Sequence, residues 1–315
     1  SHDYTEMGLV EGTDLTVGPN VLVHGEGWVG SYSRSTREFT VLRNEGTIEA
    51  DRGNDWLYVM PETLINTGTM STTASSAKLS VESSVDSFEN QGEIAVDGGG
   101  EFFLRSSIEN NGTINVNNGR MYVESTVATD DLGTVNVGTS GDFYVSSSGR
   151  IENTGQTLDV GDTVCLNGGR IVGGMVEGGL HVSQDSYLEG DVTVNGTIDL
   201  DRNDDLYVYG SLFLNGKATL GQDDEFLRFR YLPGRGTVTL GGNTSSEVQL
   251  QNDCNYDDDE LGLEENVHLL VDANTLIHGE GYVGSWGRNT RSNTKLVNTG
   301  TIQADSSGWL YVQPE

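Results

Sequence analysis

The stretch LRNEGTIEADRGNDWLYVMPE, residues 42–62, contains two short motifs that recur along the chain. The first is N-x-G-T-I, beginning at Asn44, and the second is W-L-Y-V, beginning at Trp56. In both, every second residue is apolar, as in a strand that buries one face. Copies of the first motif recur roughly every 20 to 24 residues, with one copy near Leu132 lacking its asparagine. The anchoring residues are Asn44, Asn66, Asn90, Asn110 and Asn153.

This period is typical of a solenoid, in which each rung supplies two or three short strands and stacking buries the apolar face. Ile48 and Ala50 are expected to point inward, as are Leu57 and Val59. One asparagine per rung predicts a ladder of amide hydrogen bonds, because an unpaired buried amide costs about 1–3 kcal/mol. The glycine two places after each asparagine predicts a corner with positive φ. No long stretch shows helical spacing, so we expect an all-β fold with few or no helices.

From Gly168 the motif loosens, but the alternation of apolar and polar residues persists. The acidic run DRNDD, residues 201–205, predicts an outer loop, and residues 226–236 predict a departure from regular rungs. The inward-facing candidates in this part are Leu180, Val182, Val192, Val194, Ile198, Leu200, Leu206, Val208, Leu212 and Leu214.

The sequence also contains a second, longer repeat, which spans many rungs. LIHGEGYVG, residues 276–284, nearly repeats LVHGEGWVG, residues 22–30, and residues 296–315 nearly repeat residues 42–62. The offset is about 254 residues, and roughly half of about sixty residues are identical. The sequence therefore predicts one large repeat, residues 1–254, with regular rungs over 42–166 and less regular ones over 167–254. Residues 255–315 would begin a second large repeat that continues the same solenoid. The repeat junction is marked by His24, Glu26, His278 and Glu280.

The charge balance is extreme, with 48 acidic and 17 basic residues and a net charge of −31. Such a surface repels nucleic acid, whose phosphates require Lys and Arg, and attracts divalent cations. No run approaches the roughly 18 apolar residues that a membrane span needs, so we expect no span in this segment. Two cysteines, Cys165 and Cys254, give no disulfide framework. They are interpreted as unpaired buried thiols, with an intermolecular bridge as the alternative.

The acidic residues offer two chemical hypotheses. DCNYDDDE, residues 253–260, brings oxygen ligands together as Ca²⁺ prefers, although it lacks the spaced D-x-D-x-D-G pattern. A calcium site there would use Asp253, Asp257, Asp258, Asp259 and Glu260, and the alternative is a solvated acidic loop. No other cofactor is expected to be required. Paired aspartates such as Asp130–Asp131 and Asp204–Asp205 resemble glycosidase carboxylates, but no His or Arg cluster accompanies them. We therefore expect no catalytic residues and no enzyme activity.

His24 and His278 each begin an H-G-E-G motif followed by an aromatic residue. A metal site would need partner ligands that the sequence does not show, so a tight turn with a hydrogen-bonded histidine is the favoured interpretation. One threonine per rung, at Thr47, Thr69 and Thr113, suggests an ice-binding row. Glu93 breaks that row, which argues against this function.

The L-x-N-x-G-T-I…L-x-V rungs resemble those of very large bacterial surface and secreted proteins, the filamentous-haemagglutinin-like and autotransporter-like β-helix group. The resemblance covers about residues 42–166 well and the rest loosely. It implies a right-handed parallel β-helix on or outside the bacterial cell, a handedness that right-handed crossover connections also favour.

Three functions follow as hypotheses. The first is a structural extracellular fibre or matrix component with an acidic cation-binding surface, whose partners are copies of itself, end to end or side by side. The second is an adhesin that binds glycans or other cell-surface polymers through aromatics such as Phe229, Tyr231 and Trp286. The third is a polysaccharide-active enzyme.

Overall fold

The computed structural model describes residues 5–30, 38–221, 225–234, 236–251, 259–284 and 292–314. Within these ranges the chain is all-β apart from one short helix, α1 (Thr129–Leu132). Contacts divide it into two compact units. Unit 1 is Ser1–Arg150 with Val160–Asp162, and unit 2 is Ile151–Asp159 with Thr163–Glu315. This boundary lies far from residue 254, where the large sequence repeat restarts. In the described ranges no helix has the length and apolar character that a membrane crossing requires.

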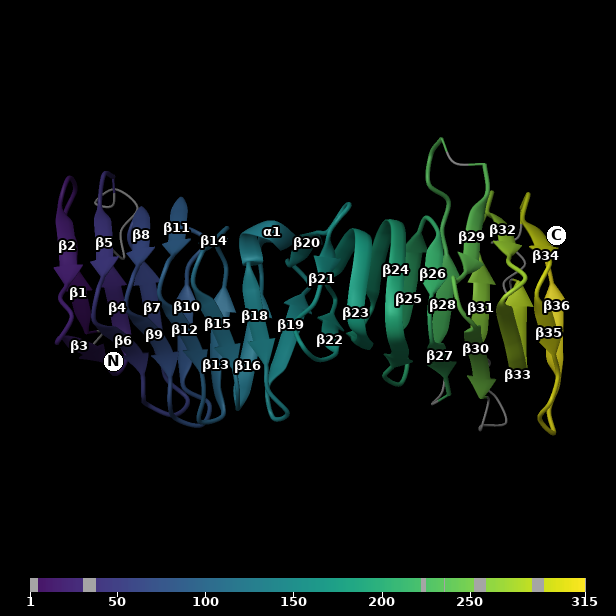
Figure 1. The fold of residues 1–315 in the computed structure, drawn as a ribbon, viewed down its shortest axis with the longest axis horizontal. Helices are drawn as coiled ribbons and strands as arrows, with labels where there is room; N and C mark the ends of the chain where they lie inside the picture. The colour runs from purple at the N-terminus through teal and green to yellow at the C-terminus, as the bar shows by residue number, and fades with distance from the viewer. Residues whose placement is uncertain are drawn as a thin grey trace. The chain divides into compact units, whose positions relative to one another are not determined.

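Unit 1 consists of parallel strand ladders on three sides of a common core (Figure 1). One ladder comprises β2 (Asp14–Val17), β5 (Val41–Asn44), β8 (Thr63–Asn66), β11 (Ser87–Asn90) and β14 (Glu109–Asn110). The second comprises β3 (Leu22–His24), β6 (Thr47–Ala50), β9 (Thr69–Thr72), β12 (Glu93–Val96), β15 (Thr113–Val116) and β18 (Thr134–Val137). The third comprises β1 (Glu6–Gly8), β4 (Gly27–Gly30), β7 (Trp56–Met60), β10 (Lys78–Val81), β13 (Gly100–Leu104), β16 (Gly119–Val123) and β19 (Asp142–Ser146).

The core of unit 1 is built from columns of equivalent residues in successive rungs. One column runs through Leu57, Leu79, Phe102, Met121 and Phe143, which pair in register and are all nearly inaccessible to solvent. Ile48, Ala50 and Val59 are also buried, so the inward positions expected from the alternation are confirmed. Because like residues stack on like, each rung closes the apolar face of its neighbour.

The glycines of the N-x-G motif have a different role from the one expected. Gly46, Gly68, Gly92 and Gly112 do not have positive φ. Instead, each lies directly against the rung before it, where a Cβ at Gly68 would overlap the carbonyl oxygen of Gly46 and one at Gly92 would overlap that of Gly68. The same carbonyls accept main-chain hydrogen bonds from the following rung, as in Glu93 N to Gly68 O at 2.9 Å. Close approach of the backbone, rather than a special dihedral angle, therefore requires glycine in this column.

Helix α1 lies in the rung that lacks the motif asparagine. It follows β17 (Thr126–Ala128), and Asp130 and Asp131 occupy its first turn. Leu132 is buried at its end, and Gly133 then adopts φ 58° before β18 begins. β20 (Arg150–Glu152) lies at the boundary between the units along the chain.

Unit 2 begins with short strands and then two long ones: β21 (Thr157–Leu158), β22 (Val164–Asn167), β23 (Arg170–Gln184) and β24 (Ser186–Leu200). The 15 residues of β24 pair in turn with three separate strands, β25 (Asp205–Tyr209), β26 (Leu212–Leu214) and β27 (Lys217–Leu220). A single continuous strand therefore replaces the three short strands of a rung. Gly190 and Gly196 have φ of 77° and 150°, and these glycines lie between the parts of β24 that pair with different strands.

The rest of unit 2 returns to three parallel ladders. The first continues from β25 through β28 (Phe226–Phe229), β31 (Glu260–Leu263) and the end of β33 (Thr275–Gly284) to β36 (Leu310–Gln313). The second continues from β26 through β29 (Val238–Gly241) and β32 (His268–Val271) to β34 (Lys295–Asn298). The third continues from β27 through β30 (Ser246–Gln251) and the start of β33 to β35 (Thr301–Gln303). The ten inward candidates named for residues 180–214 are all buried, as predicted.

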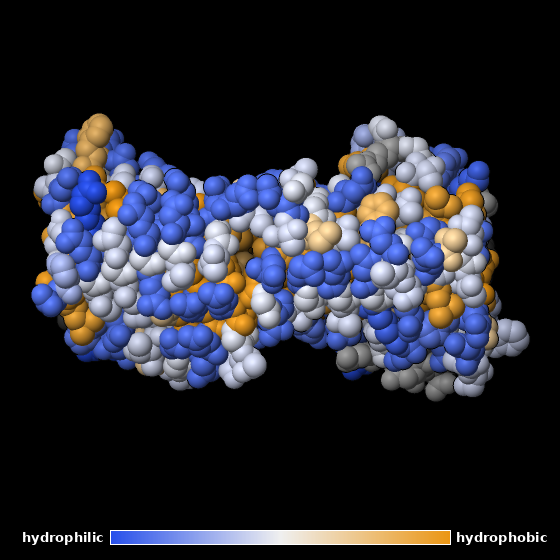
Figure 2. All heavy atoms as spheres, viewed as in Figure 1, coloured by the Kyte–Doolittle hydropathy of each residue, from blue (hydrophilic) through white to orange (hydrophobic). Residues whose placement is uncertain are grey.

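In unit 2, residues 201–205 were expected to form an outer loop and residues 226–236 an irregular rung. Asp205 is not part of an outer loop, because it begins β25 and its side chain is only 10% exposed. Strand β28 is regular, and its residues lie 21 positions after the β25 residues with which they pair. The next strand of this ladder, β31, lies 34 positions after β28, so the rung between them is longer. The longer rung agrees with the departure predicted after residue 226. On the face in Figure 2, hydrophilic side chains cover most of the strands of unit 1, with smaller hydrophobic areas between them.

Candidate functional site

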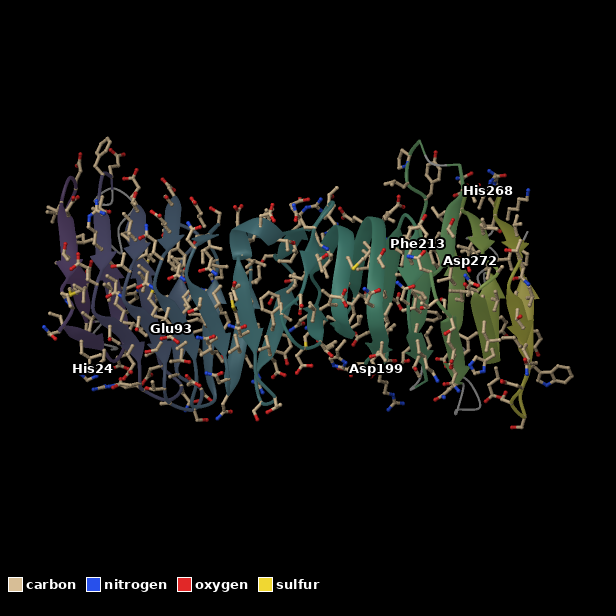
Figure 3. All side chains as sticks on the ribbon, viewed as in Figure 1. His24, Glu93, Asp199, Phe213, His268 and Asp272 are labelled. Atoms are coloured by element: carbon tan, nitrogen blue, oxygen red, sulfur yellow. The ribbon has the colours of Figure 1, made fainter. Side chains whose placement is uncertain are left out.

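The two copies of the H-G-E-G motif form the same contact. His24 Nδ1 lies 2.7 Å from Asp51 Oδ2, and His278 Nδ1 lies 2.9 Å from Asp305 Oδ2. In both, the partners are 27 residues apart, because the aspartate follows the strand of the next rung. Figure 3 shows His24 at the edge of unit 1, near β3. Both histidines are hydrogen-bonded, as the sequence favoured, but His24 ends β3 and His278 lies within β33 rather than in a tight turn.

The glycines around these histidines also share one geometry. Gly27 and Gly281 have φ of 116° and 139°, and Gly30 and Gly284 have φ of 116° and 124°. A Cβ at Gly281 would lie 2.5 Å from the carbonyl oxygen of Asp259, and one at Gly27 would overlap that of Thr5, the residue equivalent to Asp259. Both requirements, a left-handed backbone and close packing, restrict these positions to glycine.

In the second copy the histidine also meets the rung before it, whereas β3, which carries His24, is the end strand of its described ladder. His278 Nε2 lies 3.1 Å from Glu247 Oε1, and Lys217 Nζ lies 2.9 Å from the same oxygen. The side chain of His278 is 12% exposed, whereas that of His24 is 54% exposed. Hydrogen bonds from Lys217 and then His278 lower the pKa of Glu247, because both stabilise its carboxylate.

The acidic residue of the motif has different partners in the two copies. Glu26 Oε1 lies 3.3 Å from Nη1 of Arg52, whereas Glu280 Oε2 accepts a hydrogen bond of 3.0 Å from Ser306 Oγ. Arg52 and Ser306 each follow the aspartate that binds the histidine. The partner of the glutamate therefore changes from a long cationic side chain to a short hydroxyl.

An asparagine ladder lies inside unit 1, on the side of β5, β8, β11 and β14. Asn44 Nδ2 donates to Asn66 Oδ1 at 2.7 Å, Asn66 Nδ2 donates to Asn90 Oδ1 at 2.6 Å, and Asn90 Nδ2 donates to Asn110 Oδ1 at 2.6 Å. The last amide, Asn110 Nδ2, donates to the carbonyl oxygen of Leu132 at 2.7 Å, at the end of α1. All four side chains are buried, and the amide oxygens of Asn66, Asn90 and Asn110 each accept from the asparagine before them, whereas Asn44 Oδ1, at the start of the ladder, has no donor.

The ladder has defined limits. The residue below Asn44 in the preceding rung is the apolar Val17, so the ladder starts at Asn44. The second copy has the same arrangement, with Val271 below Asn298. Asn153 lies in unit 2, where its Nδ2 donates to the carbonyl oxygens of Gly173 and Met175 at 3.1 and 2.8 Å, rather than to an asparagine. The Asn153 amide therefore donates to the main chain of the next rung.

Of the residues expected to bind calcium, Asp253, Asp257 and Asp258 lie outside the described residues. Asp259 and Glu260 are both buried, with Glu260 at the start of β31 and Asp259 Oδ2 accepting a hydrogen bond from Gln251 N at 3.2 Å. Among the described residues, no group of three or more His, Cys, Asp or Glu side chains is arranged to hold a metal ion.

Asp204 and Asp205, an expected surface pair, are separated by their environments. Tyr207 Oη donates to Asp205 Oδ2 at 2.6 Å, and Arg228 Nε lies 3.5 Å from the same oxygen. Burial raises the pKa of Asp205, and burial together with the bond to Asp205 raises the pKa of Tyr207. Arg230 lies over the ring of Tyr207, 3.9 Å from its centroid. These contacts form a structural network on the ladder of β25 and β28.

Aromatic side chains form a column on the outer side of the third ladder of unit 1. Neighbouring ring centroids are 4.7 to 5.8 Å apart, and most pairs are stacked face to face; the members are Trp28, Tyr58, Trp56, Phe103, Tyr122 and Tyr144. Where two rings stack, the covered faces cannot stack on a sugar. Of the aromatics proposed for glycan binding, Phe229 is fully buried, Tyr231 is 45% exposed, and Trp286 lies outside the described residues.

Sequence reasoning identified the histidines and glutamates of the junction but not their partners. Asp51 and Asp305 could have been found, because both follow a T-I-x-A strand at the same offset from their histidines. Glu247 and Lys217 carry no such signal, since they lie in rungs without a repeated motif. Cys165 is buried in β22, and Cys254 is outside the described residues.

Comparison with protein-family models, curated proteins and solved structures finds no match to this chain.

Proposed function

We propose that this chain is a segment of an extracellular structural fibre or matrix component, built from large repeats that continue one right-handed parallel β-helix. The right hand is favoured by the general preference of parallel crossover connections. The proposal places the protein on or outside a bacterial cell, as the resemblance of its rungs to giant surface proteins implies. Its partners would be further copies of the same repeat.

The observation that carries the proposal is the identity of main-chain bonding in the two copies of the large repeat. Val41 N donates to Thr13 O at 3.1 Å, and the equivalent Lys295 N donates to Val267 O at 3.0 Å. Further along the rung, the bond from residue 45 to residue 17 measures 2.8 Å, and that from residue 299 to residue 271 measures 2.9 Å. Because the same rung-to-rung geometry returns after one large repeat, adding repeats extends the array without a new kind of interface.

The rungs are suited to a mechanical role. Separating two rungs requires the simultaneous loss of three parallel ladders and of the apolar column between them. The acidic surface gives the fibre a strong negative potential that attracts divalent cations, and residues 253–260 are the proposed place for Ca²⁺. Chelation by EDTA should then lower the thermal unfolding midpoint, and an unchanged midpoint would remove calcium from the proposal.

The length of the particle tests the proposal. At about 21 residues per rung and about 4.8 Å per rung, one large repeat of about 254 residues should add roughly 55–60 Å. Electron microscopy should show rods that lengthen by this amount when a second copy of residues 1–254 is inserted into the chain, and filaments in preparations of the native protein. Compact particles whose length does not grow, with no filaments in the native material, would contradict the fibre.

A further inference from the structure

The rung of β34, β35 and β36, drawn in yellow in Figure 1, carries an apolar face on one side. In the described part of the chain these strands pair in register only with β32 and β33, which cover the other side. Leu296, Ile302 and Leu310 are half-buried, and Val312 is 48% exposed. We call these four residues the end face.

The first copy of the large repeat shows what covers such a face. The equivalent rung is β5, β6 and β7, where the counterparts Leu42, Ile48, Leu57 and Val59 are at most 3% exposed. They are covered by β8, β9 and β10, which pair with this rung in register. Both rungs pair with their preceding strands through equivalent residues, so the following rung accounts for the difference in exposure.

The asparagine of the rung distinguishes between possible partners of the end face. Asn298 is the counterpart of Asn44, whose Nδ2 donates to Asn66 Oδ1 at 2.7 Å and to Thr69 O at 2.9 Å in the following rung. Asn298 is exposed, and its side chain bonds within its own turn, to Gly300. A rung that covers the end face buries this amide, so it should supply an acceptor at the position of Asn66.

The turn of the rung sets a second requirement. Gly46 O accepts a hydrogen bond from Thr69 N at 2.8 Å, and a Cβ at Gly68 would overlap the same oxygen. Gly300 is the counterpart of Gly46 and lies equally close to the carbonyl oxygens of the rung below it. The covering rung therefore needs a short turn that ends in glycine, as residues 67–68 do.

We propose that the end face binds a second copy of the rung of residues 63–81, in phase with the large repeat, and not the rung of residues 6–24. The second of these rungs has Val17 at the position of Asn66, so it offers no side-chain acceptor to Asn298. Its turn, residues 18–21, is also two residues longer than residues 67–68. This inference rests on the proposed continuation of one solenoid, and it determines which rung of the next repeat comes first.

The path of the chain out of the rung agrees with this partner. Pro314 follows β36 as Pro61 follows β7. A Cβ at Gly284 would lie 2.9 Å from Pro314 N, and one at Gly30 would lie 2.7 Å from Pro61 N, so the two exits have the same close contact. In the first copy two residues separate β7 from β8. A copy that starts at residue 63 can therefore be joined directly after residue 315.

Two extended chains test the proposal. The in-phase chain carries residues 63–162 after residue 315, and the out-of-phase chain carries residues 1–162 there. Hydrogen exchange of peptides from β34, β35 and β36, which occur once in each chain, is compared with that of the 315-residue chain. We expect exchange at least tenfold slower in the in-phase chain, and within twofold of the parent in the out-of-phase chain. Equal slowing in both chains, or none in the in-phase chain, would overturn the proposal.

Folding of the appended copy is read from the same data. If it stays unfolded in the in-phase chain, peptides from residues 63–162 show a second, fast-exchanging population. That result would also overturn the proposal, because docking on the end face would have covered the first rung of the appended copy.

A variant pair isolates the asparagine. Asn298→Val changes an exposed side chain in the parent, so the 315-residue chain should stay folded. In the in-phase chain it should remove most of the slowing, at least fivefold, whereas Val297→Thr, at the exposed neighbouring position of β34, should leave it within twofold. Slowing that is unchanged by Asn298→Val would overturn the proposal, because the asparagine would then not select the partner.

The exchange experiment and the electron microscopy of the fibre give separate answers. A protected end face in the in-phase chain, with no filaments in the native protein, would remove the fibre and leave this inference. Filaments in the native protein, with an end face that neither extended chain protects, would do the reverse.

Discussion

Replacement of Asn66 by alanine tests whether the asparagine ladder stabilises unit 1. The change removes three hydrogen bonds: the one that Asn66 Oδ1 accepts from Asn44, and those that Nδ2 donates to Asn90 Oδ1 and to Glu93 O. Asn44 Nδ2 loses its bond to Asn66 but keeps the one to Thr69 O at 2.9 Å, so this amide is still hydrogen-bonded in the variant. Asn90 Oδ1 loses its donor from Asn66 inside a buried column.

The magnitude follows from these contacts. Three net hydrogen bonds at about 1 kcal/mol each, with about 1–2 kcal/mol more for a buried oxygen without its donor, predict a loss of about 4–5 kcal/mol. The matched control is Asn111→Ala in the same motif, because Asn111 is exposed and its side chain donates to Glu109 Oε1 at 3.2 Å on the surface, while its main-chain bond to Asn90 O is kept in the variant. Its effect should stay within about 0.5 kcal/mol.

Urea denaturation followed by circular dichroism measures the difference, and hydrogen exchange of peptides from β8 and β11 shows whether the loss lies in unit 1. This second measurement is needed because the chain has two compact units, which can unfold separately. In a double-mutant cycle, Asn66→Ala and Asn90→Ala should cost less together than the sum of the two, by about 0.5–3 kcal/mol. The reasoning is refuted if Asn66→Ala destabilises no more than Asn111→Ala, or if the two ladder substitutions are additive.

Three further predictions concern the glycine column, the junction network and the outer charges. Gly92→Ala should destabilise unit 1 by about 1–3 kcal/mol or more, because its Cβ meets the Gly68 carbonyl, whereas Gly236→Ala meets no neighbour and should be neutral in the same urea titration. The pKa of Glu247 is lowered in the folded chain, so the stability that its carboxylate contributes is complete above its ordinary value near 4.5 and is lost as the pH falls through the lower folded value. Glu247→Gln should accordingly be less stable than the parent at pH 6, by less than about 1 kcal/mol for this partly exposed group, and the gap should narrow as the pH falls below 4.5. A gap that does not narrow on acidification would contradict the pairing. Arg105 bridges Glu82 and Glu124 at 2.8 Å each and lies over Trp56, so Arg105→Met should cost about 1–3 kcal/mol by thermal or urea unfolding, and the exposed Arg43→Met should cost almost nothing.

The regular part of the fold could be predicted from the sequence because its interactions are local and periodic. Alternation of apolar residues determines which side chains point inward, and this held for Ile48 and Leu57 as well as for the less regular positions from Leu180 to Leu214. The spacing of Asn44, Asn66, Asn90 and Asn110 places their amides in one column, since each rung adds one equivalent residue.

Other features depended on which rungs lie against each other. Asn153 has the same motif as the other asparagines, yet its amide meets main-chain carbonyls, because the next rung offers Gly173 and Met175 at that place. Asp205 belongs to an acidic run but is drawn into a strand, where Tyr207 and Arg228 are available as partners. Neither outcome has a signal in the local sequence.

At the candidate site, too, the sequence identified some residues and only the structure revealed their partners. The sequence by itself determined that His24 and His278, with Glu26 and Glu280, are equivalent residues of a large repeat, because identity at a constant offset is visible in the letters. Only the tertiary structure determined that His278 joins Asp305 and Glu247, and that Glu280 meets Ser306 where Glu26 meets Arg52. These partners lie one rung away in space but 27 and 31 residues away in the chain, and the varying lengths of the intervening turns decide which side chains meet.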